Sequence, residues 1–292
     1  MARNRCARYV RSRRRVAATS PRVRPLHPSP PPPPLRLTPR PRPSSPVHPP
    51  SPLRVRAVIK TGVISQAAGS AYVEFDATKV MCGVYGPRQG SKTASAATTD
   101  RGRLDVDVRL AAFATPGERG AANRAGDAER DFAGLLQRAL EGAVMAETFP
   151  KTSVDVYVTV LEASGAEFPA ACAAASAALA DAGVAMLDLV AACAVARVPT
   201  TLPGDDAKGG DAMNGAPGGA FALLLDPTAE EEAKADGGVV VAATGRAGDA
   251  TQLVATGRWD GDQLDEAIQL AASGCARVDE AIRDVLRAAA GG

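Results

Sequence analysis

The chain has 292 residues, and its 34 basic and 32 acidic side chains are unevenly distributed. Residues 1–56 contain 14 arginines, 15 of the 23 prolines and no acidic residue, which leaves 20 basic and 32 acidic side chains in residues 57–292. Both histidines, His27 and His48, also lie in this first segment. We therefore exclude Ser–His or Cys–His nucleophilic catalysis, histidine-based zinc sites and histidine acid–base chemistry from the rest of the chain.

The first segment, residues 1–52, is too rich in proline and too poor in apolar residues to form helices, strands or a core, and we expect it to be disordered. Three interpretations of it remain open. An arginine-rich, acid-free leader is typical of an organellar transit peptide, a basic arm can attract RNA through its phosphates, and the segment can also be an extension without function or a start-site artefact. Residues 53–292 are predicted to form the folded domain.

The five cysteines are widely spaced, and no CxxC pair occurs among them. They are Cys6, Cys82, Cys172, Cys193 and Cys275. Four of them lie in apolar stretches, which indicates reduced core residues of an intracellular protein. No run approaches the roughly 18 apolar residues of a membrane-spanning helix.

Residues 61–89 predict two consecutive strands. Apolar residues alternate with polar ones in both, as expected for strands with one buried face. The buried set comprises Ala71, Val73, Phe75, Val80, Cys82 and Val84. A turn at residues 76–78 joins the strands, and the Gly86 and Pro87 pair is expected to end the second one.

Further strands are predicted at residues 53–60, 101–110, 154–163, 188–197, 220–226, 238–243 and 251–256. Apolar stripes at helical spacing predict helices over residues 127–146, 169–182 and 262–290. The middle helix is almost continuous alanine, which indicates close packing on a sheet. This order of elements favours an α+β class, with mixed β-sheets packed with α-helices, over a repeating βα barrel.

Motifs for nucleotide binding are absent, because no GxxxxGK[ST] or GxGxxG sequence occurs. Asp181 and Asp188 resemble a carboxylate pair. However, Asp181 is expected at the end of a helix and Asp188 at the start of a strand, and these structural positions explain the two residues better than a catalytic role does. Asp226, followed by the glutamates at 230–232, is a stronger acidic cluster, although such a run is usually a solvated helical turn. Arg88 and Lys92 follow a strand end, where they are candidates for contact with an RNA backbone.

Three segments carry a specific resemblance. GSAYVEFDATKVMCGVYGPRQ, ALADAGVAMLDLVAACAV and LLLDPTAEEE occur in this order, and each resembles a segment of the RNase PH family. The resemblance extends over residues 54–288. It implies the α+β fold of that family and assembly into six-membered rings around an RNA channel. Active members are phosphate-dependent exoribonucleases.

The resemblance also allows the family's active-site positions to be compared one by one. Where active members have an arginine-containing segment that holds phosphate, this chain has an acidic stretch around Asp127. Glu167 and Phe168 stand in place of a threonine–arginine pair. Of two aspartates, the first is kept as Asp226, while Glu232 stands at the second position. Phosphorolysis needs cationic groups to hold phosphate and to stabilise the transition state, so we expect the chain alone to be inactive.

Within the family, the chain resembles the non-catalytic ring subunits of the eukaryotic RNA exosome. This implies a structural subunit that supports 3′-to-5′ RNA processing and degradation by channelling RNA. Its expected partners are other RNase PH-like subunits in a hetero-hexameric ring, an RNA-binding cap subunit and RNA, with no cofactor, metal or membrane. The expected location is nucleus, nucleolus and cytoplasm, with organellar import as an alternative. The competing hypothesis is an active phosphorolytic exoribonuclease.

Overall fold

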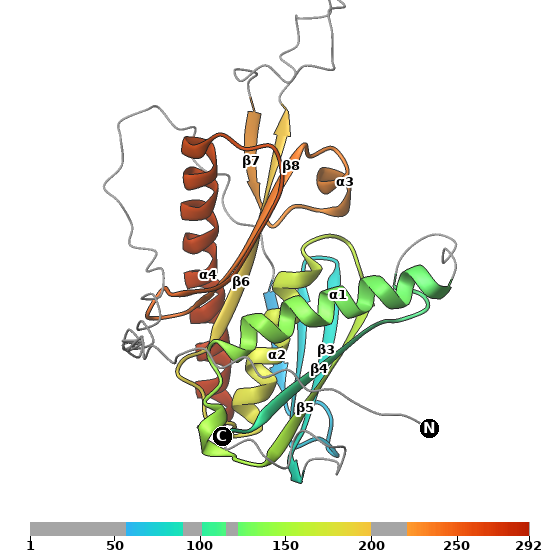
Figure 1. Ribbon diagram of the computed structural model, residues 1–292, viewed down its shortest axis with the longest axis vertical. Coiled ribbons are helices and arrows are strands. Elements are labelled where there is room, and N and C mark those ends of the chain that lie inside the picture. The colour runs from blue at the N-terminus through green and yellow to red at the C-terminus, as the bar shows by residue number, and fades with distance from the viewer. Residues whose placement is uncertain (1–56, 90–100, 115–121, 200–220, 292) are drawn as a thin grey trace, which may run out of the picture. The chain divides into compact units, whose positions relative to one another are not determined.

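The computed structural model describes residues 57–89, 101–114, 122–199 and 221–291, with the side chains of residues 122–125 excepted. The predicted leader, Lys92 and residues 53–56 therefore lie outside the described residues. Nine strands in the described ranges form two sheets, and three longer helices pack around them (Figure 1). The predicted α+β class is confirmed. No helix among the described residues is long and apolar enough to cross a bilayer.

The first sheet has the order β1-β2-β3-β5-β4. Its strands are β1 (Ala57–Thr61), β2 (Gly69–Phe75), β3 (Thr78–Gln89), β4 (Arg103–Leu110) and β5 (Thr152–Glu162). The pairs are antiparallel except for β4 and β5, which run parallel. The predicted hairpin is β2–β3, and the six apolar residues predicted to be buried in it are all at most 5% exposed.

The second sheet has the order β7-β6-β8-β9 and is antiparallel throughout. Its strands are β6 (Val190–Pro199), β7 (Phe221–Leu225), β8 (Gly237–Thr244) and β9 (Ala250–Gly257). A short helix, α3 (Ala229–Glu232), lies between β7 and β8, and a 3-10 turn, η2 (Ala146–Thr148), precedes β5. All four strands of this sheet therefore come from the second half of the chain.

Helix α2 (Glu167–Asp181) lies between the two sheets, in contact with β2 and β3 on one side and β6 on the other. Every residue from Pro169 to Leu179 is buried. The run of alanine thus packs on two sheets, where the sequence predicted one. Close packing extends to its end, because a Cβ on Gly69 of β2 would lie 2.2 Å from the Ala182 nitrogen.

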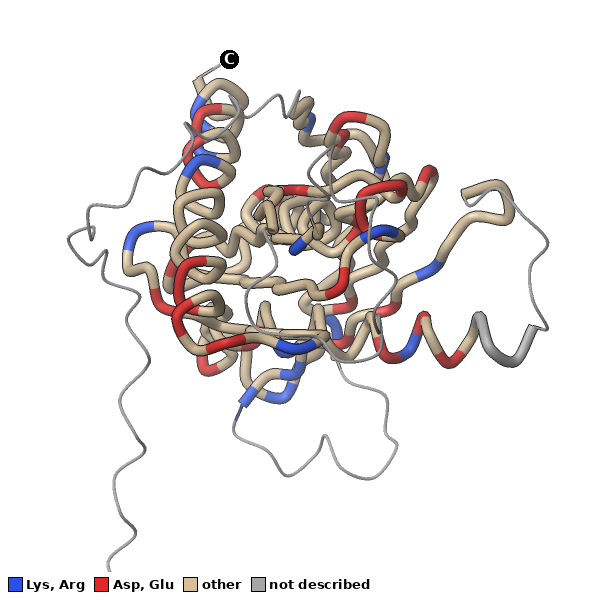
Figure 2. The backbone as a smooth tube through the Cα atoms, turned by 90° about the horizontal axis from the view of Figure 1, so that it is seen from above, with Lys and Arg blue, Asp and Glu red and all other residues tan. Residues whose placement is uncertain are grey.

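Helix α4 (Gly261–Ala290) packs on β6 and β8 of the second sheet and also contacts α2, and α1 (Ala122–Glu141) packs on β4 and α2. The buried stripe of α4 includes Ala271, Cys275 and Ile282. Charged residues of both signs occupy its remaining surface (Figure 2). The four described cysteines are all free and buried, as predicted.

The structure corrects the predicted bounds of α1. The helix starts at residue 122, not 127, because its first residues, ANRA, include none of the larger apolar residues that mark the predicted stripe. It ends at residue 141, not 146, because Gly142 approaches Thr251 of β9, where a Cβ would lie at 3.1 Å, and Val144 forms a bridge with Met186. The stripe therefore continues past the last helical residue.

Two predicted strand limits are also wrong. Strand β3 continues through Gly86 and Pro87 to Gln89. The proline lies where the register of the β3–β5 ladder shifts, so no regular backbone hydrogen bond is lost through its missing N–H. Strand β6 begins at Val190, not at Asp188. The Asp188 carboxylate instead accepts a hydrogen bond from the Arg246 N–H at 2.7 Å and pairs with Arg283 of α4.

Candidate functional site

The candidate site lies at the N-terminus of α2, where both sheets meet. The loop at residues 163–166 enters the helix with left-handed backbone at Gly165 (φ 101°) and Ala166 (φ 51°). Thr78, the first residue of β3, fixes this loop by donating to the Gly165 carbonyl (2.6 Å) and accepting from the Ser164 N–H (3.1 Å). Because Thr78 is 98% buried, this anchor is shielded from water.

The β7–α3 segment packs directly against the same loop. A Cβ on Gly165 would lie 2.5 Å from the Pro227 oxygen, so a glycine is needed for this approach. The Ala229 N–H donates to the Ser164 carbonyl at 2.8 Å. The two sheets are thereby joined by backbone contacts at the start of α2.

Two carboxylates lie at this helix terminus. Glu232 of α3 accepts a hydrogen bond from the Ala166 N–H at 3.1 Å, and Glu167 accepts one from the Gly165 N–H at 3.3 Å. Burial raises the pKa of Glu232, and the neighbouring charge of Glu167 adds to this effect against the lowering by the Ala166 N–H. Free N–H groups at a helix N-terminus commonly bind phosphate, but here carboxylates of the protein itself occupy the N–H groups of Gly165 and Ala166, directly before the first helical residue.

Asp226 lies next to these groups, at the end of β7, with left-handed backbone (φ 48°). It accepts a hydrogen bond from the Ala194 N–H at 3.2 Å and a long one from the Cys193 thiol at 3.9 Å. Burial raises the pKa of Asp226 to about 6, although both hydrogen bonds act in the opposite direction. A carboxyl with this pKa exchanges its proton near neutral pH.

Phe168 occupies the position at which the resemblance placed an arginine in active members. Its ring packs edge-to-face on Phe132 of α1, with centroids 5.7 Å apart. Asp127 does not face this pair, because it is exposed and forms an ion pair with Arg130 at 2.9 Å. Asp127 therefore contributes little repulsion, and the apolar and acidic character of the site comes from Phe168, Glu167 and Glu232.

The glutamates of the acidic cluster predicted after Asp226 make different contacts. Glu231 caps α3 by accepting from the Thr228 N–H, while Glu230 is exposed and Glu232 turns to the α2 loop. Within the described ranges, no group of three or more His, Cys, Asp or Glu side chains is placed to hold a metal ion.

The other predicted candidates lie elsewhere. Asp181 accepts from the Ser70 N–H at 2.9 Å, so Asp181 and Asp188 serve separate structural contacts. Arg88 is exposed at the end of β3, with its guanidinium 5.2 Å from the ring centre of Tyr85. Tyr85 in turn packs edge-on against Tyr157 of β5.

Sequence reasoning missed Thr78, Cys193 and Phe132, whose contacts depend on neighbours far along the chain. Thr78 was interpreted as part of a turn, and Cys193 and Phe132 were assigned to apolar core. No local pattern distinguishes such residues from ordinary turn and core positions.

Comparison with known proteins defines the class of protein. The models of the 3′ exoribonuclease family match residues 56–185 as domain 1 and residues 188–274 as domain 2. The chain belongs to this RNase PH family.

Particular relatives are components of the exosome. The chain is 36% identical over 236 residues to exosome complex component RRP41-like of Arabidopsis thaliana, with 80% of each chain covered. It is 38% identical over 242 residues to human exosome complex component MTR3, covering 79% of this chain and 82% of the relative. Rice Rrp46 has the same fold, with a TM-score of 0.61 and 20% identity over 80% of this chain and 96% of that structure. The motifs AAGSAYVEF and LLDPTAEEE also indicated a resemblance to MTR3, and this is confirmed.

Proposed function

We propose that this chain is a non-catalytic subunit of the exosome core ring, which supports 3′-to-5′ RNA processing and degradation by helping to channel RNA. Its partners in this proposal are other RNase PH-like subunits in a hetero-hexameric ring, together with an RNA-binding cap subunit. The homology to exosome components supports the assembly, and the candidate site supports the lack of catalysis.

One observation carries the proposed inactivity. At the N-terminus of α2, Glu232 and Glu167 accept hydrogen bonds from the backbone donors of the loop, and the ring of Phe168 packs against α1. Inorganic phosphate would have to displace two carboxylates and would find an aromatic side chain in place of a guanidinium. Phosphoryl transfer depends on preorganised positive charge around the transferred group, so this arrangement disfavours the reaction.

A second function, phosphorolytic exoribonuclease activity, is favoured by Asp226. Its pKa of about 6 suits a general acid that must donate and recover a proton near neutral pH. Asp226 lies beside the same helix terminus as Glu232. The two functions differ in a measurable product, because phosphorolysis releases nucleoside diphosphates.

The experiment combines assembly and activity. The purified full chain is incubated with single-stranded RNA that is uniformly labelled at its internal phosphates, with and without inorganic phosphate, and the released nucleotides are separated by chromatography. We expect no phosphate-dependent nucleoside diphosphate, and we expect a stable complex when the chain is co-expressed with RNase PH-like subunits. Diphosphate release that Asp226→Asn abolishes and the exposed control Asp265→Asn preserves would establish the enzymatic function instead.

A further inference from the structure

All three tyrosines in the described residues lie on one face of the first sheet, which we call the tyrosine face. They are Tyr72 of β2, Tyr85 of β3 and Tyr157 of β5. Side chains alternate between the two faces of a strand, and neighbours such as Val73 and Val156 are fully buried on the opposite face, where α2 packs. Tyr157 is 46% exposed, and its ring meets that of Tyr85 edge-on with the centroids 5.8 Å apart. The first sheet therefore has an open aromatic surface on the side away from the core.

One carboxylate on the tyrosine face has no counter-ion. Asp155 stands opposite Tyr85 in the β3–β5 ladder and two residues before Tyr157, so its side chain lies beside both rings. None of the ion pairs within the described ranges includes Asp155. The two aspartates of the neighbouring strand β4, in contrast, each pair with an arginine of the same strand. An aromatic ring beside a free negative charge suits an arginine side chain, which can stack on the ring and pair with the carboxylate.

The fold already holds arginines against aromatic rings at two places. The guanidinium of Arg197 lies 5.0 Å from the ring centre of Trp259 and pairs with Asp236 at 2.7 Å. On the tyrosine face, the guanidinium of Arg88 lies 5.2 Å from the ring centre of Tyr85. Because Arg88 takes Tyr85, the exposed ring of Tyr157 is the one open to a further arginine.

The chain itself contains a segment of the matching chemistry. Residues 39–43, PRPRP, alternate proline with arginine and lie outside the described ranges. Proline-rich segments bind aromatic surfaces in the extended polyproline II conformation, which costs them little conformational entropy. Residues 1–56 contain no acidic side chain that could compete for these arginines.

The point at which this segment joins the fold places it within reach of the tyrosine face. Residues 44–56 connect it to Ala57, the first residue of β1, which is the edge strand of the same sheet. Tyr157 is about 22 Å from Ala57, because it lies three strand spacings across the sheet and five residues along it. The connecting residues can span about 40 Å when extended. A tether of this length gives the segment an effective concentration in the millimolar range at the face.

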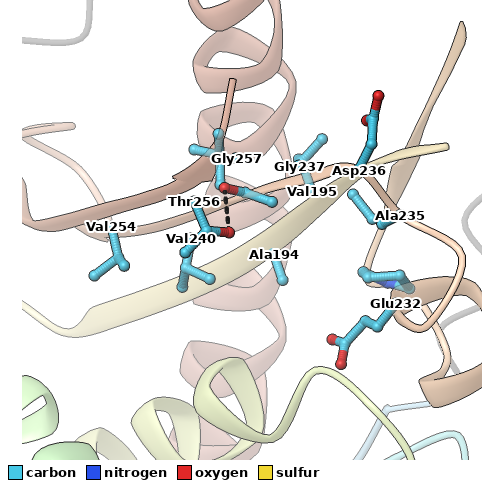
Figure 3. Close-up of a pocket in the computed structure, with 14 residues that line it drawn as sticks. Ala194, Val195, Glu232, Ala235, Asp236, Gly237, Val240, Val254, Thr256 and Gly257 are labelled. Carbon is cyan, nitrogen blue, oxygen red and sulfur yellow. Dashed lines mark hydrogen bonds between the residues drawn. The ribbon is translucent and has the colours of Figure 1, made fainter. Parts of the chain in front are cut away.

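The second sheet offers a different kind of open surface. Its hollow of about 310 Å³ (Figure 3) is lined by small and aliphatic residues with two carboxylates, Glu232 and Asp236, and no aromatic ring is among its lining residues. Asp236 is already paired with Arg197. The hollow therefore lacks a ring on which proline or arginine could pack. An RNA strand suits the tyrosine face less well than an arginine does, because Asp155 would repel its phosphates.

We propose that the PRPRP segment, residues 39–43, binds the tyrosine face of the same chain and places an arginine between Tyr157 and Asp155. The proline rings cover the exposed aromatic surface, and the arginine supplies the counter-ion that Asp155 lacks. This contact does not depend on ring assembly, so it stands apart from the proposed function.

The test places a nitroxide label on the full chain beside the segment, at Ser44→Cys, and follows backbone amide signals by NMR. Cys6→Ser removes the cysteine that lies outside the described ranges, and the four described cysteines are buried, which protects them from labelling. We expect the amide signals of Asp155 and Tyr157 to lose more than half of their intensity, compared with the same sample after the label is reduced. Signals of β9, in the second sheet, should keep theirs.

Two variants remove the proposed contact from opposite sides. Arg40→Glu combined with Arg42→Glu reverses the charge of the segment, and Asp155→Lys reverses the charge of the face; each should abolish the loss of intensity. Arg22→Glu combined with Arg24→Glu changes the net charge equally outside the segment and should preserve the loss. The amide spectrum of each variant shows whether it is folded.

Three outcomes would overturn the inference. Amide signals of Asp155 and Tyr157 may not differ between labelled and reduced samples, or they may lose intensity equally in all variants. A loss that also appears when labelled chains are mixed with isotope-enriched unlabelled chains assigns the occupant to a second copy. Tyr157 signals that ignore the label but shift with a single-stranded oligonucleotide assign the face to RNA.

Discussion

The Asp226 carboxyl makes the stability of this chain depend on pH in a way that can be calculated. Burial raises its pKa from 3.8 to about 6, so the charged form is disfavoured in the folded chain. The stability that a carboxyl with a raised pKa contributes to the folded chain is complete below the pKa of the unfolded chain, near pH 4. It is lost as the pH rises through the folded-state pKa of about 6. The loss is about 3 kcal/mol at pH 8, at about 1.4 kcal/mol for each unit of pKa.

Substitution Asp226→Asn removes this ionisation while keeping an oxygen that can accept from the Ala194 N–H. We therefore expect the free energy of unfolding of the variant, relative to wild type, to rise by about 3 kcal/mol between pH 4 and pH 8. Urea denaturation of both full-length proteins across this range measures the difference.

Asp265→Asn, at an exposed position of α4, is the matched control, and its stability relative to wild type should change little over the same range. An Asp226→Asn curve that runs parallel to wild type at all pH values would refute the reasoning, because ionisation would then cost the same in folded and unfolded chains.

Three further predictions concern other parts of the molecule. Gly165→Ala should destabilise the chain by about 2 kcal/mol or more in urea denaturation, since its Cβ would lie 2.5 Å from the Pro227 oxygen and its φ is 101°; the control Gly261→Ala, where the Cβ meets open space, should have a small effect. Arg283→Met should cost about 3 kcal/mol, because it leaves two partly buried carboxylates without their guanidinium, and an effect below about 1 kcal/mol would contradict this. Arg88→Ala in the assembled complex should lower RNA affinity. The slope of log binding constant against log salt concentration should become shallower by about the contribution of one phosphate contact, as measured by fluorescence anisotropy over a salt series. An unchanged slope would count against an RNA contact.

The β2–β3 hairpin of the first sheet was predictable because its apolar residues alternate with polar ones along both strands. Ala71, Val73 and Phe75 have the period of two that a one-faced sheet requires, and the structure buries them as expected. The limits of α1 were not predictable in the same way. Its first residues, ANRA, include none of the larger apolar residues of the stripe. At the other end, the apolar stripe continues into a bridge that Val144 makes with Met186.

The candidate site was predictable as a set of residues but not as an arrangement. The family resemblance identified Glu167, Phe168, Asp226 and Glu232, and the structure brings three of them, Glu167, Asp226 and Glu232, to the start of α2 with Phe168 beside them. The contacts of these side chains could not be predicted, because they depend on side-chain directions. Examples are the backbone N–H groups that donate to the two glutamates and the ion pair of Asp127 with Arg130. A sequence pattern specifies position along the chain, whereas these contacts depend on tertiary geometry.

The alanine-rich helix between the sheets has a mechanical consequence. Because methyl groups fill the space on both sides of α2, the thickness of that single helix determines how far apart the two sheets stand. The site is built half from each sheet, with Thr78 on one side and Asp226 and Glu232 on the other. A larger residue in the middle of α2 would act as a wedge, separating the halves of a site that it does not touch. The helix therefore determines the distance between the two sheets, and its small side chains limit how far that distance can change without disturbing the site.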